Sequence, residues 1–323
     1  METTANRTRS IDWANMLKRS SGVIILIFVT IFFSVAADNF LAISNMSNIL
    51  LQTSIVGIVT IGMTIVMLTA GIDLSVGSVA ALAGAITAGM MSREGWPMIP
   101  AMLCGLGLGS LLGVVNGVLI VFGGLPPFVA TLAMLGIARG LTLVYTEGKP
   151  IAGLPETFTN LGSGSIGPVP IPIVLWLLIL IVAYFVLNYT RFGLHIYAIG
   201  GNEETSRLAG VSVNRIKISA YAISGLLAAT TGLLLTSRLW SAQPQMGVGL
   251  ELEAIAAAVL GGVSLFGGVG SVIGACIGAL IVGVIGNGLN LMRIPSYYQQ
   301  VIKGVVFILA VLVDIFSKGE KNP

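Results

Sequence analysis

Ionisable side chains are rare in the apolar stretches of this chain, and their positions are the first guide to its chemistry. They are Asp73, Arg139, Arg238, Glu251, Glu253, Lys303 and Asp314. An ionised group deep in hydrocarbon costs at least about 2.5 kcal/mol, so each should face a cavity, a partner or a helix end. Asp73 and the pair Glu251 and Glu253 fall where apolar runs begin, and the three cations could pair with them or extend to an interface. For Asp73, capping of a helix near Ser75 and a role in a transport path both remain open.

Neutral polar side chains inside the apolar runs indicate a second kind of chemistry, the passage of an uncharged polar solute. With Asp73, the candidates for lining such a path are Gln52, Thr53, Asn116, Thr131 and Tyr145. Sugars need donors and acceptors that match their hydroxyls, together with an aromatic face, and this set offers both. Hydrogen bonding between helices explains such residues equally well.

Signatures of catalysis are missing from the sequence. The Gly148-Lys149 pair is followed by Pro150 and does not form a phosphate-binding loop, so this chain is not expected to bind ATP. There is no nucleophile elbow or zinc-protease helix. His195 stands alone beside Arg191, which predicts no metal site. Cys104 and Cys276 lie in Gly-rich apolar runs and are expected to be packing residues without a disulfide. We therefore expect neither an enzyme nor a bound cofactor.

The composition predicts an all-α membrane protein. Hydrophobic residues make up 55% of 323 positions and charged residues 9%, and many apolar runs approach the roughly 20 residues that a helix needs to cross a bilayer. In lipid the backbone must satisfy its own hydrogen bonds, and the runs lack the alternation of barrel strands. Ten spans are expected, near residues 22–37, 49–71, 75–91, 98–122, 126–145, 168–187, 216–239, 250–265, 268–291 and 298–316.

The distribution of Lys and Arg predicts that both termini are cytoplasmic. With that orientation, ten basic residues lie in cytoplasmic segments and three, Arg93, Lys149 and Arg293, lie outside. The first apolar run also resembles a secretory signal, with small residues at 34–36, but nine further apolar runs favour an uncleaved span.

Residues 1–323 are expected to form one transmembrane domain in a lipid bilayer. Its cytoplasmic parts are residues 1–21, a segment at 188–215 and a tail at 317–323. The outer loop at 146–167 is expected to be irregular.

A polar island at residues 198–217, between two spans, is predicted to form a short helix on the cytoplasmic face. Asn202 can cap it, Gly210 can end it, and Asn214 can cap the following span. A helix held between two spans can pass a partner's motion into the bundle, whereas a solvated loop would absorb it. The residues assigned to this docking role are Gly200, Gly201, Asn202, Glu203, Glu204, Arg207, Leu208 and Gly210.

Two sets of glycines recur every four residues and predict faces where helices approach closely. They are Gly105, Gly109, Gly113 and Gly117, and then Gly270, Gly274 and Gly278. The chain also contains weak internal echoes. Residues 112–120 and Pro126 resemble residues 282–290 and Pro295, and residues 71–74 resemble residues 247–250. Five spans separate the echoes, so the second copy would be inverted, an arrangement found among transporters.

Several ordered motifs closely resemble the ribose permeases of bacterial ATP-binding cassette importers, over residues 39–314. They are Gly71-Ile-Asp-Leu-Ser-Val-Gly-Ser78, Gly200-Gly-Asn-Glu203, Arg207-Leu-Ala-Gly210, Ser241-Ala-Gln-Pro244, Gly261-Gly-Val-Ser-Leu265, Gly267-Gly268, Asn287-Gly-Leu-Asn-Leu291 and Ser296-Tyr-Tyr-Gln299.

The resemblance implies a monosaccharide permease subunit in the bacterial inner membrane, with ribose as the leading substrate. It implies a homodimer that works with a cytoplasmic ATPase and a periplasmic or lipid-anchored sugar-binding protein. ATP and Mg²⁺ would be used by the ATPase, and residues 200–217 would contact it. No nucleic-acid partner is expected. A stand-alone channel or a proton-coupled carrier remains the alternative, and Asp73 is its only strong candidate for a titrating group. A membrane scaffold or receptor subunit without solute flux is a second, less favoured alternative.

Overall fold

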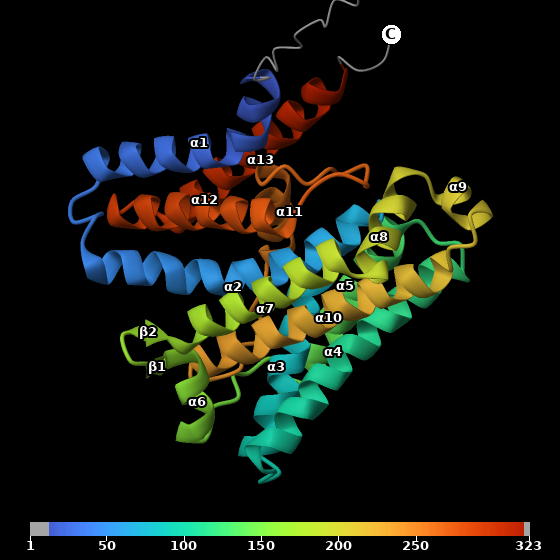
Figure 1. The fold of residues 1–323 in the computed structure, drawn as a ribbon. Coiled ribbons are helices and arrows are strands. Elements are labelled where there is room, and N and C mark those ends of the chain that lie inside the picture. The colour runs from blue at the N-terminus through green and yellow to red at the C-terminus, as the bar shows by residue number, and fades with distance from the viewer. Residues whose placement is uncertain (1–12, 320–323) are drawn as a thin grey trace, which may run out of the picture.

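The computed structural model describes residues 13–319, with the side chains of residues 22–308 and 311–312. Helices dominate the described chain (Figure 1), which confirms the prediction of an all-α fold. The helices are α1 Trp13–Ala36, α2 Ile43–Leu68, α3 Val76–Ser92, α4 Met98–Val121, α5 Pro127–Thr146, α6 Glu156–Ser163, α7 Ile171–Tyr189, α8 Arg191–Gly201, α9 Glu203–Leu208, α10 Val213–Arg238, α11 Leu250–Leu260, α12 Val272–Leu291 and α13 Ser296–Gly319.

Six helices among the described residues are long and apolar enough to cross a membrane, namely α2, α4, α5, α7, α10 and α12. Each of them covers most of a predicted span. The prediction for residues 250–265 was wrong in extent, because α11 ends at Leu260 after 11 residues. Gly262 adopts a φ of +85°, a conformation that ends helices, and a Gly-rich loop then follows to Ser271. An isolated helix of that length is too short to cross the hydrocarbon core.

The loop at 146–167 is more ordered than its composition predicted. It contains α6 and leads into a two-stranded antiparallel sheet of β1 Ser165–Ile166 and β2 Val169–Pro170, in which Ser165 faces Pro170. The loop is held because Phe158 is fully buried and its carbonyl accepts a hydrogen bond from Ser237 Oγ at 2.7 Å. Burial of one aromatic side chain therefore overrides the turn-forming composition.

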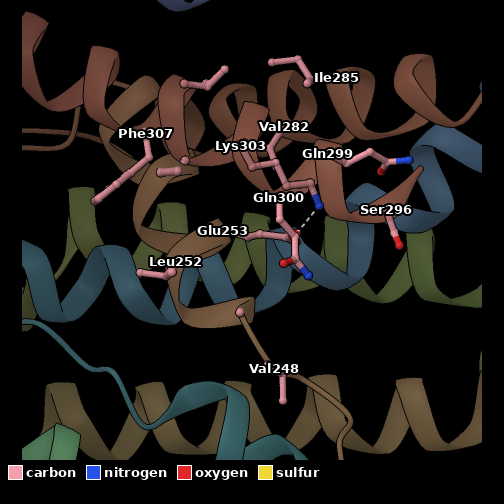
Figure 2. A pocket seen from close by; sticks show the side chains of 14 residues that line it. Val248, Leu252, Glu253, Val282, Ile285, Ser296, Gln299, Gln300, Lys303 and Phe307 are labelled. Carbon is pink, nitrogen blue, oxygen red and sulfur yellow. Dashed lines mark hydrogen bonds and ion pairs between the residues drawn. The ribbon is translucent and has the colours of Figure 1, made fainter. Parts of the chain in front are cut away.

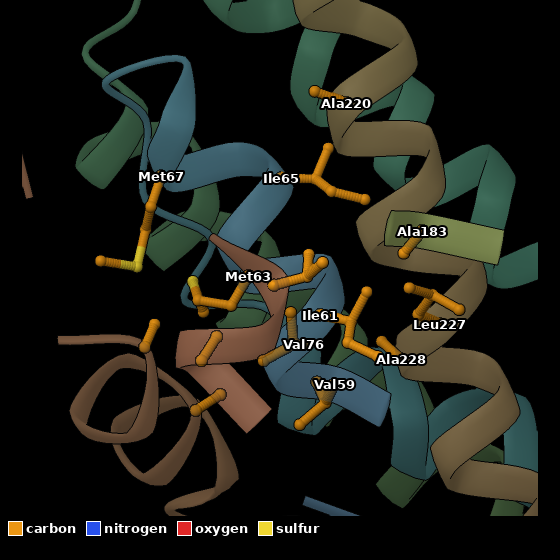
Figure 3. Packing of buried hydrophobic residues seen from close by; sticks show 14 of the residues in the cluster. Val59, Ile61, Met63, Ile65, Met67, Val76, Ala183, Ala220, Leu227 and Ala228 are labelled. Carbon is orange, nitrogen blue, oxygen red and sulfur yellow. The ribbon is translucent and has the colours of Figure 1, made fainter. Parts of the chain in front are cut away.

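The largest buried cluster lies where α2 passes α10 and α3 (Figure 3). Ile61 and Met63 of α2, Leu227 and Ala228 of α10, and Val76 of α3 meet there. The second half of α2 is buried on nearly all sides, as expected for a helix at the centre of a bundle. By contrast, α7 exposes a row of large apolar side chains, which suits contact with lipid tails: Leu177, Leu178, Ile181, Val182 and Phe185.

Glycines let α4 and α10 approach closely. A Cβ added at Gly109 would lie 2.5 Å from the Gly225 carbonyl, and one at Gly113 would overlap the Tyr221 carbonyl. Gly105 and Gly117 are also tightly placed, against Thr87 and Ile218. These contacts are the kind of packing that the spacing predicted.

The second glycine set needs a correction. Gly274 and Gly278 lie on α12 against backbone of residues 261 and 257, but Gly270 precedes that helix. It has a φ of +139° and packs against Val263 within the loop. The helix begins only at Val272, because Ser271 caps it by accepting a hydrogen bond from Gly274 N at 3.0 Å.

Candidate functional site

The polar island forms two short helices, α8 and α9, that project from the end of the bundle where α2 and α10 also meet (Figure 1). Asn202 caps α9, since its Oδ1 accepts a hydrogen bond from Thr205 N at 2.8 Å. Gly210 follows α9 with a φ of +84°. Both local predictions are confirmed. Asn214 does not cap α10, because that helix already begins at Val213.

Glu203 fixes α9 to the beginning of α10. Its two carboxylate oxygens accept from Lys217 Nζ at 2.7 Å and from Arg207 at 3.0 Å. The hydrogen bond from Lys217 lowers the pKa of Glu203 below its ordinary value, so the carboxylate stays charged at neutral pH. Because Glu203 is partly exposed, solvent screens this pair. Its main effect is to orient the short helix.

The outer surface of α9 is available for a partner. Leu208 is 85% exposed at the end of the helix, and Glu204 and Arg207 are exposed beside it. Leu194 on α8 is also exposed. An exposed leucine surrounded by charges of both signs is typical of a protein interaction surface rather than of a lipid-facing helix. We call the exposed side chains of Leu194, Glu204, Arg207 and Leu208 the α8–α9 surface.

The inner side of α8 rests on the bundle through backbone contacts. A Cβ added at Gly200 would overlap both the Leu68 carbonyl at the end of α2 and the backbone nitrogen of Gly268. Gly268 N donates to that same carbonyl at 3.1 Å. Tyr197 Oη donates to the Gly270 carbonyl at 3.0 Å. Close contacts therefore join the helices that carry the α8–α9 surface to the loop between α11 and α12. At Gly200 this contact is between backbones, with no flexible side chain in between.

Asp73 lies in the break between α2 and α3 and is buried. Its Oδ1 accepts from Ser75 N at 3.0 Å and from Ser75 Oγ at 2.6 Å, and its Oδ2 accepts from Ser224 Oγ of α10 at 2.8 Å. Asn116 of α4 in turn donates to Ser75 Oγ at 3.0 Å. Hydrogen bonds to one carboxylate and its neighbour thus join the helix break to α4 and α10.

Thr131 belongs to the same region, since its hydroxyl lies within hydrogen-bond distance of the carbonyls of Ile72, at 3.2 Å, and Pro127, at 2.9 Å. The structure therefore brings Asp73, Asn116 and Thr131 together, as a path would require, but all three are buried. Asp73 already receives several protein donors, an arrangement that holds a helix break in place.

The other three predicted path residues lie apart from this cluster. Tyr145, near the end of α5, has its ring 5.6 Å from the Arg93 guanidinium. Thr53 is buried on α2 and faces Gly283 of α12. Gln52 lines a cavity described below. The six residues therefore do not form one continuous lining.

Of the cations that the sequence places in or beside spans, one pairs with an acidic residue there. Lys303 Nζ of α13 donates to Glu253 Oε1 of α11 at 2.5 Å. Arg139 instead donates to the carbonyls of Pro244 and Met246, at 2.7 and 2.9 Å. The side chain of Asp314 lies outside the described residues.

The Glu253–Lys303 pair faces a cavity of about 460 Å³ between α11, α12 and α13 (Figure 2). Gln300 and Gln299 contribute amides and Ser296 a hydroxyl, while Leu252, Val282, Ile285 and Phe307 supply apolar wall. A volume of this size falls within the range of small-molecule sites. We call this space the α13 cavity.

A second cavity of about 230 Å³ shares Val248 and Glu253 with the α13 cavity. It extends to Gln52 of α2 and Arg238 of α10. Glu253 therefore stands where the two spaces meet.

Sequence reasoning missed Gln300 and Phe307 as lining residues. A signal was present, because residues 296, 300, 303 and 307 recur at three- and four-residue spacing on one helix and place polar groups on a single face of an apolar run. Their partner Glu253 is 50 residues away from Lys303, so only the fold shows that this face is covered by α11.

Cys104 and Cys276 are both free. Cys276 is buried as a packing residue, as predicted, but Cys104 is exposed, so the packing prediction was wrong for Cys104. Among the residues that the structure describes, no group of three or more His, Cys, Asp or Glu side chains could hold a metal ion.

Comparison with known proteins identifies a protein family that matches this chain. The family model described as branched-chain amino acid transport system / permease component matches residues 45–311. The ribose import permease protein of Escherichia coli is 45% identical over 96% of this chain and 98% of its own length. The corresponding protein of Bacillus subtilis is 45% identical over 91% and 90%. The D-allose transport system permease protein of Escherichia coli is 38% identical over 90% and 89%.

No solved structure matches the chain. The relatives, in contrast, extend over almost all of it, including both α8–α9 and the α13 cavity. Taken with the bundle of membrane-spanning helices, the family model and these relatives show that the chain belongs to the family of transport-system permease components that includes the ribose import permeases.

Proposed function

We propose that this chain is the membrane subunit of an ATP-driven importer for a monosaccharide, and that the sugar is ribose. The observation that supports this most strongly is the 45% identity to ribose import permeases from two distant bacteria over nearly the full chain. The lower identities to the D-allose permease, at 38%, and the xylose permease, at 34%, favour ribose over those two sugars. The function is transport and not catalysis, so free energy must come from a partner.

We infer that this partner is a cytoplasmic ATP-binding cassette ATPase that docks on the α8–α9 surface. Leu208 would enter a groove of the ATPase, and Glu204 and Arg207 would fix its orientation. ATP and Mg²⁺ would remain on that subunit. A sugar-binding protein would deliver ribose to the opposite face of the bundle.

The architecture would then be a homodimer in the inner membrane with both termini in the cytoplasm, in which α11 enters the bundle without crossing it alone. The echoes in the sequence support an inverted repeat: residues 77 and 247, beside the two related motifs, are in backbone contact. Asn116 and Asn287 each lie near the end of a helix and each hydrogen-bond to a residue at the start of another. Two inverted halves in contact are suited to opening first one side and then the other.

The proposed mechanism is alternating access. Closure of the ATPase on ATP would push α8, whose backbone contacts at Gly200 pass the displacement to the loop at 261–271. That loop is continuous with α11, which bears Glu253 at the meeting point of the two cavities. Motion at the cytoplasmic face would in this way change which side of the membrane the cavities reach.

Reconstitution tests this function. The chain is placed in lipid vesicles with its ATPase and sugar-binding protein, and uptake of labelled ribose is measured with each partner omitted in turn. Unlabelled ribose, allose and leucine serve as competitors. We expect uptake only with both partners and ATP, with competition by ribose far ahead of the other two. Competition by leucine instead would assign the solute named in the family description.

A stand-alone channel or proton-coupled carrier is less well supported. Its only strong candidate for a titrating group, Asp73, does not line either of the two cavities. The carboxylate of Asp73 already accepts hydrogen bonds from Ser75 and Ser224. Flux without the ATPase would restore that alternative.

A further inference from the structure

The Glu253–Lys303 pair offers hydrogen-bonding capacity to the α13 cavity that the protein does not use. Lys303 carries three donors, and among the described residues it donates only to Glu253. Glu253 Oε2 and the Gln300 amide make no hydrogen bond to another described side chain. The side chains of Glu253 and Lys303 are partly exposed, at 27% and 35%, and Gln300 is exposed. Their unused donors and acceptors are therefore open to the cavity and can bind a polar occupant.

The arrangement of these groups favours a neutral polyhydroxylated molecule. An ammonium and a carboxylate in direct contact can bind two neighbouring hydroxyls, of which one donates to the carboxylate while the other accepts from the ammonium. An anionic solute would meet the carboxylate of Glu253, and a cationic one would meet Lys303. Phe307 and Leu252 give the apolar wall that the C–H face of a sugar requires.

We propose that the α13 cavity is a sugar-binding subsite of the permease itself, in which Glu253 and Lys303 bind vicinal hydroxyls and Gln300 binds a further one. This proposal rests on the proposed sugar-import function and adds to it a specific site where the sugar binds during transport. The second cavity, with Gln52 and Arg238, continues from Glu253 and gives the sugar a polar route toward the core of the bundle.

The subsite is also placed to respond to the ATPase. Glu253 lies in the first turn of α11, and the other end of that helix joins the loop that contacts Gly200. A displacement of α11 relative to α13 would lengthen the 2.5 Å contact and separate the donor from the acceptor. The sugar would then lose its paired partners when α8 moves.

A thiol-protection experiment tests the subsite directly. Gln300→Cys is introduced into a Cys104→Ser background, and the buried Cys276 is left in place. The complete transporter in lipid, with its ATPase and sugar-binding protein, is treated with a water-soluble maleimide in the presence of ribose or leucine. We expect ribose to slow labelling several-fold and leucine to have no effect. Ile166→Cys, on the exposed hairpin, should label at one rate throughout.

A paired substitution provides the second measurement. Glu253→Gln combined with Lys303→Met removes both charges together, so neither remains unpaired in the membrane. Ribose uptake per ATP hydrolysed should fall about tenfold, since hydrogen bonds to charged groups are lost. When Gln300→Cys is added to this pair, ribose should no longer protect the introduced thiol. The matched control Glu156→Gln changes an exposed acid on α6 and should keep wild-type uptake.

The two proposals fail separately. If the unmodified transporter imports ribose but ribose leaves labelling of Gln300→Cys unchanged, the subsite is wrong and the import function stands. If the unmodified transporter shows no ATP-dependent ribose uptake, both are overturned.

Discussion

At the scale of single residues, Leu208 is the most direct test of the α8–α9 surface. It is 85% exposed, so replacing it should leave the bundle unchanged. We expect Leu208→Glu to reduce ATP-dependent uptake at least about tenfold, because a buried charge at an interface is costly. Ile166→Glu, at another open apolar position on β1, serves as control and should transport normally. Equal uptake by both variants would rule out docking through Leu208.

Glu203 gives a pH prediction. Its pKa is lowered in the folded protein by Lys217, so the stabilisation is present above the unfolded value of 4.5 and is lost as the pH falls through the folded value. Lys217→Gln should therefore lower the free energy of unfolding at pH 7, by no more than about 1 kcal/mol, and with it the unfolding midpoint. The difference from wild type should shrink at acidic pH. A difference that stays constant as the solution is acidified would contradict the ion-pair explanation.

How far sequence could predict the site is clearest at this scale. Asn202 and Gly210 were predicted correctly, because capping and positive φ depend on neighbours within a few residues. Gln300 could not be placed, because its role depends on α11 covering one face of α13. Asp73 and Asn116 were grouped by residue type, and the structure does bring them together, although it buries them among protein partners.

At the scale of helices, the close contact between α4 and α10 depends on glycines, which have no side chain to hold the two helices apart. Gly113→Ala places a Cβ against the Tyr221 carbonyl and should destabilise the protein by about 1–3 kcal/mol through overpacking. Gly107→Ala lies on the same helix with nothing within 4 Å, and its higher helix propensity should leave stability unchanged or raised. Thermal unfolding in detergent measures both. Similar midpoints for the two variants would show that the helices can separate without cost.

The junction between α8 and the bundle can be tested with a closely matched pair of variants. Gly200→Ala would push a Cβ into the Leu68 carbonyl, whereas neighbouring Gly201→Ala meets nothing within 4 Å. We expect the first variant to bind the ATPase but to transport several-fold less sugar per ATP, and the second to behave as wild type. Wild-type coupling in Gly200→Ala would show that motion does not pass through this contact.

Helix existence was predictable and helix extent was not, for a physical reason. Apolar runs identify spans because lipid demands internal hydrogen bonding, and the bounds of α4 and α5 follow their runs closely. The end of α11 at Leu260 and the late start of α12 depend on the conformations of Gly262 and Gly270, which hydropathy does not record. Burial of Phe158 likewise orders a loop that its composition predicts to be irregular.

At the scale of the whole molecule, the proposed function places a solute path and a motor-docking surface on one chain, joined by α11. The surface lies on α8 and α9, and the cavities lie between α11, α12, α13, α2 and α10. Under the proposed function ATP is bound by the partner, so we expect the docking surface and the path to communicate mechanically. Their separation predicts that coupling and sugar binding can be lost independently by mutation.

The most direct test compares ribose uptake with ATP hydrolysis in the same vesicles, using the wild-type chain and one with Glu203→Lys and Glu204→Lys. Both chains are reconstituted with the ATPase and the sugar-binding protein, and insertion and dimerisation are checked first. We predict ATP-dependent uptake by the wild type and little uptake by the variant, in which the charge at the start of α9 is reversed. Uptake that continues without ATP, or normal ATP-driven uptake by the variant, would contradict an importer driven through α8 and α9.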